Sequence, residues 1–102
     1  MQLIPDRIQS VLDDIVKRLK GFQSIDKIVL FGSRARDDAE ERSDIDIAIL
    51  CPNATAREWL DVCEIVENTK TLLEIDVVRL DTASQELQRR VFDEGRILYE
   101  KN

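Results

Sequence analysis

The short connection between two strand-like segments is the feature that most restricts how this chain can fold. Residues 27–31 (Lys-Ile-Val-Leu-Phe) and 44–50 (Asp-Ile-Asp-Ile-Ala-Ile-Leu) have the apolar, β-branched character of buried strands. The residues between them are polar and few, whereas neighbouring parallel strands need a long crossover connection, usually a helix. The two segments are therefore expected to be neighbours in a sheet, and an antiparallel pairing suits them.

Helical and strand patterns alternate along the rest of the chain. Apolar residues recur at the spacing of an amphipathic helix in residues 6–20. Helical patterns return in residues 55–69 and from residue 81 or 82 to about residue 93. Residues 73–80 and 96–99 have the composition of strands. This alternation predicts the α/β class, with a small mixed β-sheet flanked by helices.

Size and charge exclude several classes of protein. The 102 residues predict one domain, 1–102, and the net charge of −6 argues against general nucleic-acid binding and against attachment to an anionic membrane. The sequence has no histidine, which excludes imidazole bases, Ser-His and Cys-His nucleophile pairs and His-ligated metals. Any chemistry must therefore use carboxylates, hydroxyls, lysine, arginine or the two cysteines.

The cysteines and the N-terminal residues indicate a cytoplasmic protein. Cys51 and Cys63 are too few for a disulfide framework and lack the spacing of zinc ligands, so they are predicted to be small apolar fillers in a reducing compartment. Pro5 and Asp6 interrupt the first apolar residues, which argues against a signal peptide. No apolar stretch approaches the ~20 residues needed to span a bilayer.

Two aspartates on the second strand are candidates for a metal site. Asp44 and Asp46 are two residues apart, so on a strand they point to one face while Ile45 and Ile47 point to the other. Two such carboxylates repel each other unless a cation lies between them, and Mg²⁺ binds through one or two carboxylates together with substrate phosphates. Taken alone, the motif also fits an edge strand with a solvated polar face.

A third carboxylate strengthens this hypothesis. Asp76 lies among apolar residues in the strand-like segment 73–80. If that strand pairs beside the second strand, Asp76 reaches the same face, and three carboxylates suit a two-metal site for phosphoryl transfer, with metals ~3.5–4 Å apart. Asp76 is equally well explained as a polar position on a half-exposed strand, and Glu74, on the same face by parity, competes for the role.

The turn after the first strand is a candidate phosphate-binding segment. Gly32 permits a close approach of the backbone to a phosphate, and Ser33 offers a hydroxyl and an N–H group at the start of a short helix. Arg34, Arg36 and Arg42 add positive charge around this turn. Gly-Ser turns end many strands, so the indication comes from the position of this turn just before the carboxylate pair.

These motifs together resemble a known family. The Gly-Ser pair 32–33, followed after ten residues by the Asp-Ile-Asp run 44–46, resembles the signature of the nucleotidyltransferase superfamily related to DNA polymerase β. Residues 31–36 and 43–49 are especially similar to the minimal nucleotidyltransferases of prokaryotes, which are stand-alone domains of about this length. The resemblance implies the polymerase β-like nucleotidyltransferase fold.

The resemblance also implies a role for each motif residue. Asp44, Asp46 and Asp76 would be the catalytic carboxylates that bind two Mg²⁺ ions, and Asp76 would activate the acceptor hydroxyl. Gly32 and Ser33 would hold the triphosphate of ATP or another NTP. Members of the family transfer a nucleoside monophosphate to a hydroxyl and release pyrophosphate. The three arginines are not part of the motif and are assigned a supporting electrostatic role.

Minimal members of this family often pair with a HEPN-domain ribonuclease toxin. Several are thought to neutralise that toxin by adding AMP to a tyrosine near its active site. The resemblance therefore implies a protein adenylyltransferase that acts as an antitoxin, in a hetero-oligomer with the toxin or as a homodimer alone. Three alternatives stay open: an antitoxin that masks its partner by contact without catalysis, a small-molecule transferase of the aminoglycoside type, and a structural α/β domain.

Overall fold

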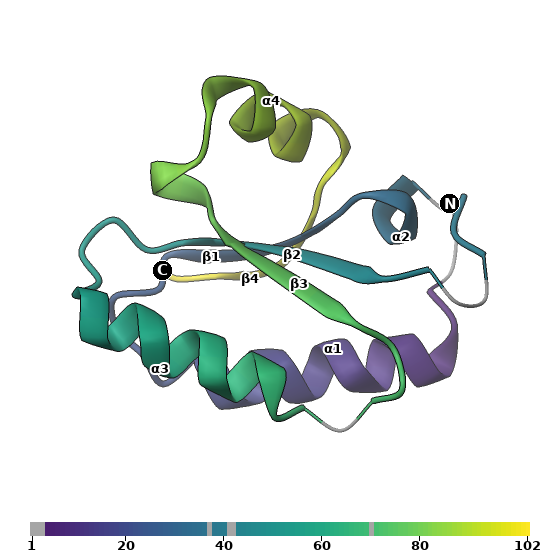
Figure 1. Ribbon diagram of the computed structural model, residues 1–102, viewed down its shortest axis with the longest axis horizontal. Coiled ribbons are helices and arrows are strands. Elements are labelled where there is room, and N and C mark those ends of the chain that lie inside the picture. The colour runs from purple at the N-terminus through teal and green to yellow at the C-terminus, as the bar shows by residue number, and fades with distance from the viewer. Residues whose placement is uncertain (1–3, 37, 41–42, 70) are drawn as a thin grey trace.

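The computed structural model describes residues 4–36, 38–40, 43–69 and 71–102 of the protein. Helices and strands alternate along the chain, which confirms the predicted α/β class (Figure 1). In chain order the elements are α1 (Asp6–Leu19), β1 (Lys27–Phe31), α2 (Ser33–Arg36), β2 (Ile45–Leu50), α3 (Ala56–Glu67), β3 (Ile75–Arg79), the 3₁₀ turn η1 (Leu80–Thr82), α4 (Gln85–Glu94) and β4 (Arg96–Glu100).

The four strands form one mixed sheet in the order β3-β2-β1-β4. β1 pairs antiparallel with β2, as the short connection predicts, and antiparallel with β4 on its other side. β2 pairs parallel with β3, and the chain between them contains α3, which supplies the crossover that a parallel pair requires. The two central strands are therefore those next to the predicted phosphate-binding turn and the carboxylate pair.

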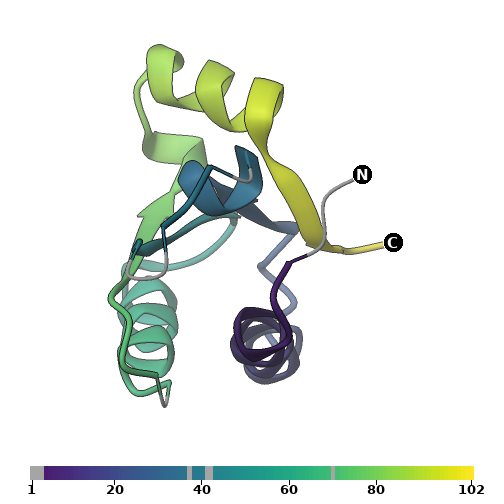
Figure 2. The ribbon, with the colours of Figure 1, turned by 90° about the vertical axis from the view of Figure 1, so that its right-hand side faces the viewer.

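Helices cover both faces of this sheet. α1 and α3 lie side by side against one face, and α4 lies on the other (Figures 1 and 2). Alternate residues of β1 and β2, such as Leu30 and Ile47, pack with α1 and α3 in the larger core, whereas Val29 and Ala48 pack with Val91 of α4 in a smaller one. The side chains of both central strands thus alternate between two apolar layers, and a polar residue on either strand interrupts a layer.

Two predicted boundaries between β3 and α4 were wrong. The strand expected at residues 73–80 is confined to β3, because the chain turns into η1 directly after Arg79. The helix expected to open at residue 81 or 82 begins at Gln85, because the hydroxyl of Ser84 accepts a hydrogen bond from the Leu87 N–H (3.1 Å) and so caps the helix. Thr55 caps α3 in the same way, by accepting a hydrogen bond from the Glu58 N–H.

The cysteines have the environment expected of apolar fillers. Cys51 is fully buried, and burial, with a further contribution from Asp81, raises the pKa of its thiol to about 11. Burial also raises the pKa of Cys63, which is half-buried. Within the part of the chain described here, no helix combines the length and the apolar character needed to cross a membrane.

Candidate active site

Asp46 and Asp76 lie side by side on the sheet. They are register partners in the parallel pair of β2 and β3, where adjacent strands are about 4.8 Å apart. Their neighbours Ile45 and Ile75 are also partners and pack in the core beneath α1 and α3, so both aspartates belong to the opposite face. Asp46 is half-buried and Asp76 is exposed. The structure therefore places two of the three predicted carboxylates together.

Asp44 does not lie on the strand, contrary to expectation. β2 begins at Ile45, and Asp44 is the exposed residue immediately before it. The strand starts there because the Ile45 N–H donates a hydrogen bond to the Glu74 carbonyl of the neighbouring chain segment (2.9 Å), whereas the Ser43 carbonyl accepts a hydrogen bond from the Arg34 side chain. Asp44 nevertheless remains close enough to Asp46 to affect its ionisation.

The electrostatics of Asp46 reflect this crowding. Burial raises the pKa of its carboxyl above the ordinary value, and the negative charges of Asp76 and Asp44 raise it further. Arg90 of α4 and Arg36 of α2 oppose the shift. Negative charge is thus concentrated at one place on the sheet, and a bound cation would stabilise it.

Gly32 lies directly against the Asp46 carboxylate. Its φ of +76° is in the left-handed region that favours glycine, and a Cβ at this position would lie 2.3 Å from Asp46 Oδ2. Phe31, the last residue of β1, is the register partner of Asp46, which explains the proximity. Ser33 follows as the first residue of α2. The predicted phosphate-binding turn and the predicted metal-binding strand therefore meet.

The arginines near this turn differ from one another. Arg36 forms ion pairs with Asp38 (3.0 Å) and Glu94 (3.1 Å), and its charge acts on Asp46 as the expected electrostatic role requires. Arg34 is instead buried and donates hydrogen bonds to the Ser43 carbonyl. Arg42 lies outside the described residues.

Arg90 is a residue near the site that sequence reasoning missed. It lies on the exposed side of α4, where it approaches Glu94, and its charge opposes the rise in the pKa of Asp46. No local motif marks it, since only the packing of α4 on the sheet brings it toward β2. Its part in the site was therefore invisible in the sequence.

The donor set fits a magnesium ion that is completed by other ligands. Among the described residues, no group of three or more acidic or cysteine side chains is arranged to hold a metal ion by itself. Mg²⁺ usually keeps several waters and binds through one or two carboxylates plus substrate phosphates. Asp46, with Asp44 and Asp76 near enough to raise its pKa, offers carboxylate oxygens of the kind that such an ion needs.

A polar groove of about 350 Å³ begins at Asp76. It runs between β3 and the loop after α3, and its walls are formed by Val66, Glu67, Thr69, Thr71, Leu73, Glu74, Ile75 and Asp76. Glu74 precedes β3 and is not a register partner of a β2 carboxylate, so the structure favours Asp76 over Glu74 as the third acidic residue of the site.

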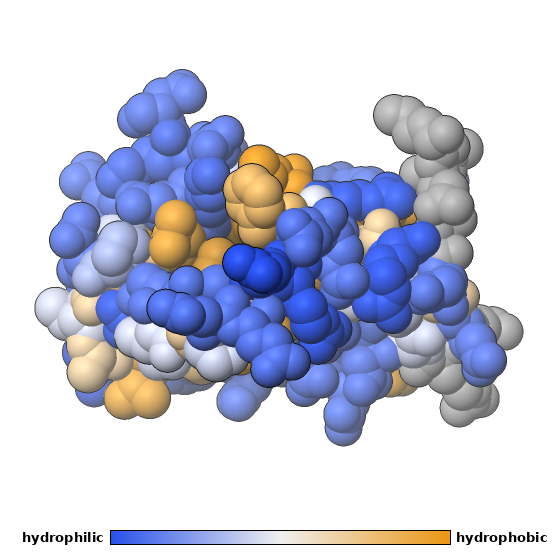
Figure 3. All heavy atoms as spheres, turned by 90° about the horizontal axis from the view of Figure 1, so that it is seen from above, coloured by the Kyte–Doolittle hydropathy of each residue, from blue (hydrophilic) through white to orange (hydrophobic). Residues whose placement is uncertain are grey.

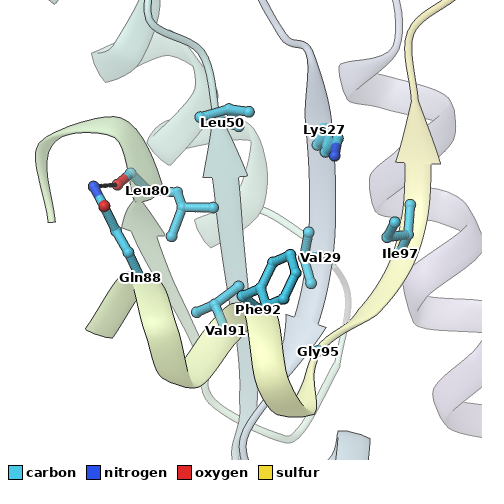
Figure 4. A pocket seen from close by; sticks show the side chains of 9 residues that line it. All are labelled: Lys27, Val29, Leu50, Leu80, Gln88, Val91, Phe92, Gly95 and Ile97. Atoms are coloured by element: carbon cyan, nitrogen blue, oxygen red, sulfur yellow. Dashed lines mark hydrogen bonds between the residues drawn. The ribbon is translucent and has the colours of Figure 1, made fainter. Parts of the chain in front are cut away.

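A second groove, of about 390 Å³, lies away from these carboxylates. It is formed between α4 and strands β1, β2 and β4, and apolar side chains make most of its walls (Figure 4). Seen from the α4 side, apolar surface is surrounded by hydrophilic residues (Figure 3). Phe92 and Ile97, two of the lining residues, are among the exposed large apolar side chains. None of the predicted site residues lines this groove.

The fold and the site define the class of protein. Residues 13–102 match the family described as polymerase beta, nucleotidyltransferase, and the chain belongs to this family. It is a nucleotidyltransferase with the polymerase β-like fold, as the glycine-serine turn and the aspartates at positions 44 and 46 predict.

Individual relatives narrow the comparison. The chain is 41% identical over 85 residues to a protein of Methanocaldococcus jannaschii named "Putative protein adenylyltransferase MJ0604", and the match covers 74% of this chain and 79% of that protein. A crystal structure of a toxin-antitoxin with AMP-PNP contains a chain 26% identical to this one, with a TM-score of 0.73 and coverage of 89% and 74%. A structure of a tri-AMPylated Shewanella oneidensis HEPN toxin in complex with MNT antitoxin gives 25% identity, a TM-score of 0.66 and coverage of 91% and 72%.

Proposed function

We propose that this protein is a Mg²⁺-dependent adenylyltransferase that moves AMP from ATP to a tyrosine hydroxyl of a partner HEPN toxin and thereby acts as its antitoxin. The observation that carries the proposal is the in-register pair of Asp46 and Asp76 with Gly32 packed against Asp46. The similarity to a chain crystallised in a toxin-antitoxin with AMP-PNP, and to one from a complex with a tri-AMPylated HEPN toxin, supports the nucleotide and the partner.

Each residue of the site has a distinct part in this reaction. Asp44 and Asp46 would hold the Mg²⁺, and the backbone of Gly32 and Ser33 would receive the triphosphate. When bound, Mg²⁺ neutralises charge on the triphosphate and favours ionisation of the acceptor hydroxyl. The acceptor oxygen forms a bond to the α-phosphorus, the bond from that phosphorus to the bridging oxygen breaks, and pyrophosphate leaves. The hydroxyl proton passes to Asp76.

The position of Asp76 suits a protein acceptor. Asp76 is exposed, lies on the outermost strand of the sheet and opens into the polar groove beside β3. A side chain carried by another protein can therefore reach it without entering a closed pocket. Nucleotidyl transfer depends on positioning and charge neutralisation, so the lack of histidine does not hinder it.

The experiment is a transfer assay with the intact partner. The protein is incubated with Mg²⁺, ATP labelled at the α-phosphate and a purified HEPN-domain toxin, and the toxin is examined by intact and peptide mass spectrometry. Label is expected on a toxin tyrosine. Asp46→Asn should abolish it, whereas Arg57→Gln, a change at an exposed arginine of α3, should not affect it.

Other outcomes would identify the alternatives. Neutralisation of the toxin without label would show an antitoxin that acts by contact. Label on an aminoglycoside but not on the toxin would show a small-molecule transferase. Full transfer by Asp46→Asn would contradict the role assigned to the carboxylates.

A further inference from the structure

The buried guanidinium of Arg34 is a feature of α2 that the proposed reaction does not use. Only 8% of this residue is exposed, although a buried charge is costly unless hydrogen bonds compensate it. Both Nε (3.3 Å) and Nη2 (2.9 Å) of Arg34 donate to the Ser43 carbonyl. Two N–H groups of the guanidinium thus donate to the backbone carbonyl just before Asp44.

The Ser43 carbonyl belongs to the peptide group that joins Ser43 to Asp44. The next peptide group, between Asp44 and Ile45, is held through the Ile45 N–H, which donates to the Glu74 carbonyl (2.9 Å). Both peptide planes that flank the Cα of Asp44 are therefore anchored, one to α2 and one to the residue before β3. The orientations of these two planes determine φ and ψ of Asp44. The two hydrogen bonds therefore fix the direction in which the Asp44 side chain leaves the backbone.

The other end of this connection is equally well fixed. Arg34 follows Ser33 directly, and the N–H groups of Ala35 (3.0 Å) and Arg36 (3.1 Å) donate to the Gly32 carbonyl. The Nε of Arg96 on β4 donates to the Ala35 carbonyl (2.9 Å), which ties the single turn of α2 to the sheet. Arg34 thus connects the hydrogen-bonded turn at Gly32-Ser33 to an aspartate that lies outside any strand.

We infer that Arg34 is a positioning residue that places Asp44 relative to the Gly32-Ser33 turn, so that one metal ion can contact Asp44 and a phosphate held by the turn. The inference deepens the proposed function and rests on it. It gives Arg34 and Arg36 different roles. Arg34 acts through the geometry of the two hydrogen bonds that it donates, whereas Arg36 acts through its charge. A lysine at position 34 would keep the charge and lose the planar pair of donors.

The test measures metal binding without catalysis. Mn²⁺ serves as the probe ion, with an ATP analogue that has a methylene bridge between the α and β phosphates, and binding is followed by electron paramagnetic resonance. Arg34→Lys is expected to raise the Kd for Mn²⁺ by about tenfold or more, as loss of an outer-shell contact does at other metal sites. Arg57→Lys is the matched control, at an arginine whose side chain is 84% exposed, and should bind as the wild type does.

Two results keep the inference separate from the proposed function. Unchanged Mn²⁺ affinity in folded Arg34→Lys would overturn the inference alone, whereas a wild-type protein that binds neither Mn²⁺ nor the analogue would overturn the proposed function. A measurement on the wild type covers the case in which the variant fails to fold. The Nε proton of Arg34 should exchange with solvent much more slowly than that of Arg57, and equal exchange would overturn the inference.

Discussion

Replacing Gly32 by alanine tests the closest contact of the site. The φ of +76° at this position costs a residue with a Cβ about 1–2 kcal/mol. The new Cβ would also lie 2.3 Å from Oδ2 and 3.2 Å from Cγ of Asp46, so that carboxylate must turn away, at a further cost of about 0.5–1.5 kcal/mol. Lower entropy of the unfolded chain offsets about 0.4–1 kcal/mol of this. We therefore expect a loss of roughly 1–3 kcal/mol in the free energy of unfolding.

Thermal melts followed by circular dichroism measure this loss. In a domain of this size, about 1 kcal/mol shifts Tm by roughly 4–8 °C, so Gly32→Ala should melt on the order of 10 °C below the wild type. Gly21→Ala is the matched control, because no atom lies within 4 Å of its added Cβ, and its Tm should stay equal or rise slightly. The double variant Gly32→Ala/Asp46→Ala removes the clash but keeps the backbone strain. If the clash is real, the double variant should lose less stability than the sum of the two single variants. A loss equal to that sum, or a Gly32→Ala protein as stable as Gly21→Ala, would refute the reasoning.

Two further predictions concern pH. Because burial and neighbouring charges raise the pKa of Asp46, the ionised carboxylate destabilises the fold above that pKa. Asp46→Asn should therefore have a higher Tm than the wild type at neutral pH, and the difference should shrink toward pH of about 4. A lower Tm of Asp46→Asn at pH 7 would contradict this prediction. Burial by itself would raise the pKa of Asp81, but hydrogen bonds from the Cys51 amide (2.9 Å) and from Arg79 (2.9 Å) outweigh the effect of burial, so the pKa is lowered. The ionised Asp81 carboxylate therefore stabilises the fold at neutral pH, and this stabilisation is lost as the pH falls through the lowered pKa. Asp81→Asn should therefore lower the free energy of unfolding by about 1–3 kcal/mol at pH 7, and its Tm should fall less than that of the wild type as the pH is lowered. Plots of Tm against pH that run parallel for the two proteins would contradict this prediction.

The strands of the site were predictable because their patterns are local. β1 and β2 match the expected segments to within one residue, since alternation of side chains between two faces leaves its trace in consecutive positions. The proximity of Asp46 and Asp76 followed from the same parity, once β3 was assumed to pair with β2. Gly32 was placed near the carboxylates on other grounds, because it ends the strand that was expected to neighbour theirs.

The position of Asp44 and the role of Arg34 were not predictable in this way. Parity does not say where a strand begins, and here the beginning depends on a bond between Arg34 and the Ser43 carbonyl, nine positions away in the sequence. In the sequence Arg34 and Arg36 look alike. Only the packing of α2 decides that one guanidinium is buried and the other faces acidic side chains.

The register of β2 and β3 makes the site sensitive to insertions in a particular way. A slip of β3 by one residue would turn Asp76 into the apolar layer under α3 and bring Ile75 to the polar face, because side chains alternate with a period of two. A slip by two residues would keep the face but move the Asp76 carboxylate by about 6.6 Å along the strand, away from its register partner Asp46. An insertion before β3 therefore keeps the two carboxylates together only if the register of Asp76 with Asp46 is preserved.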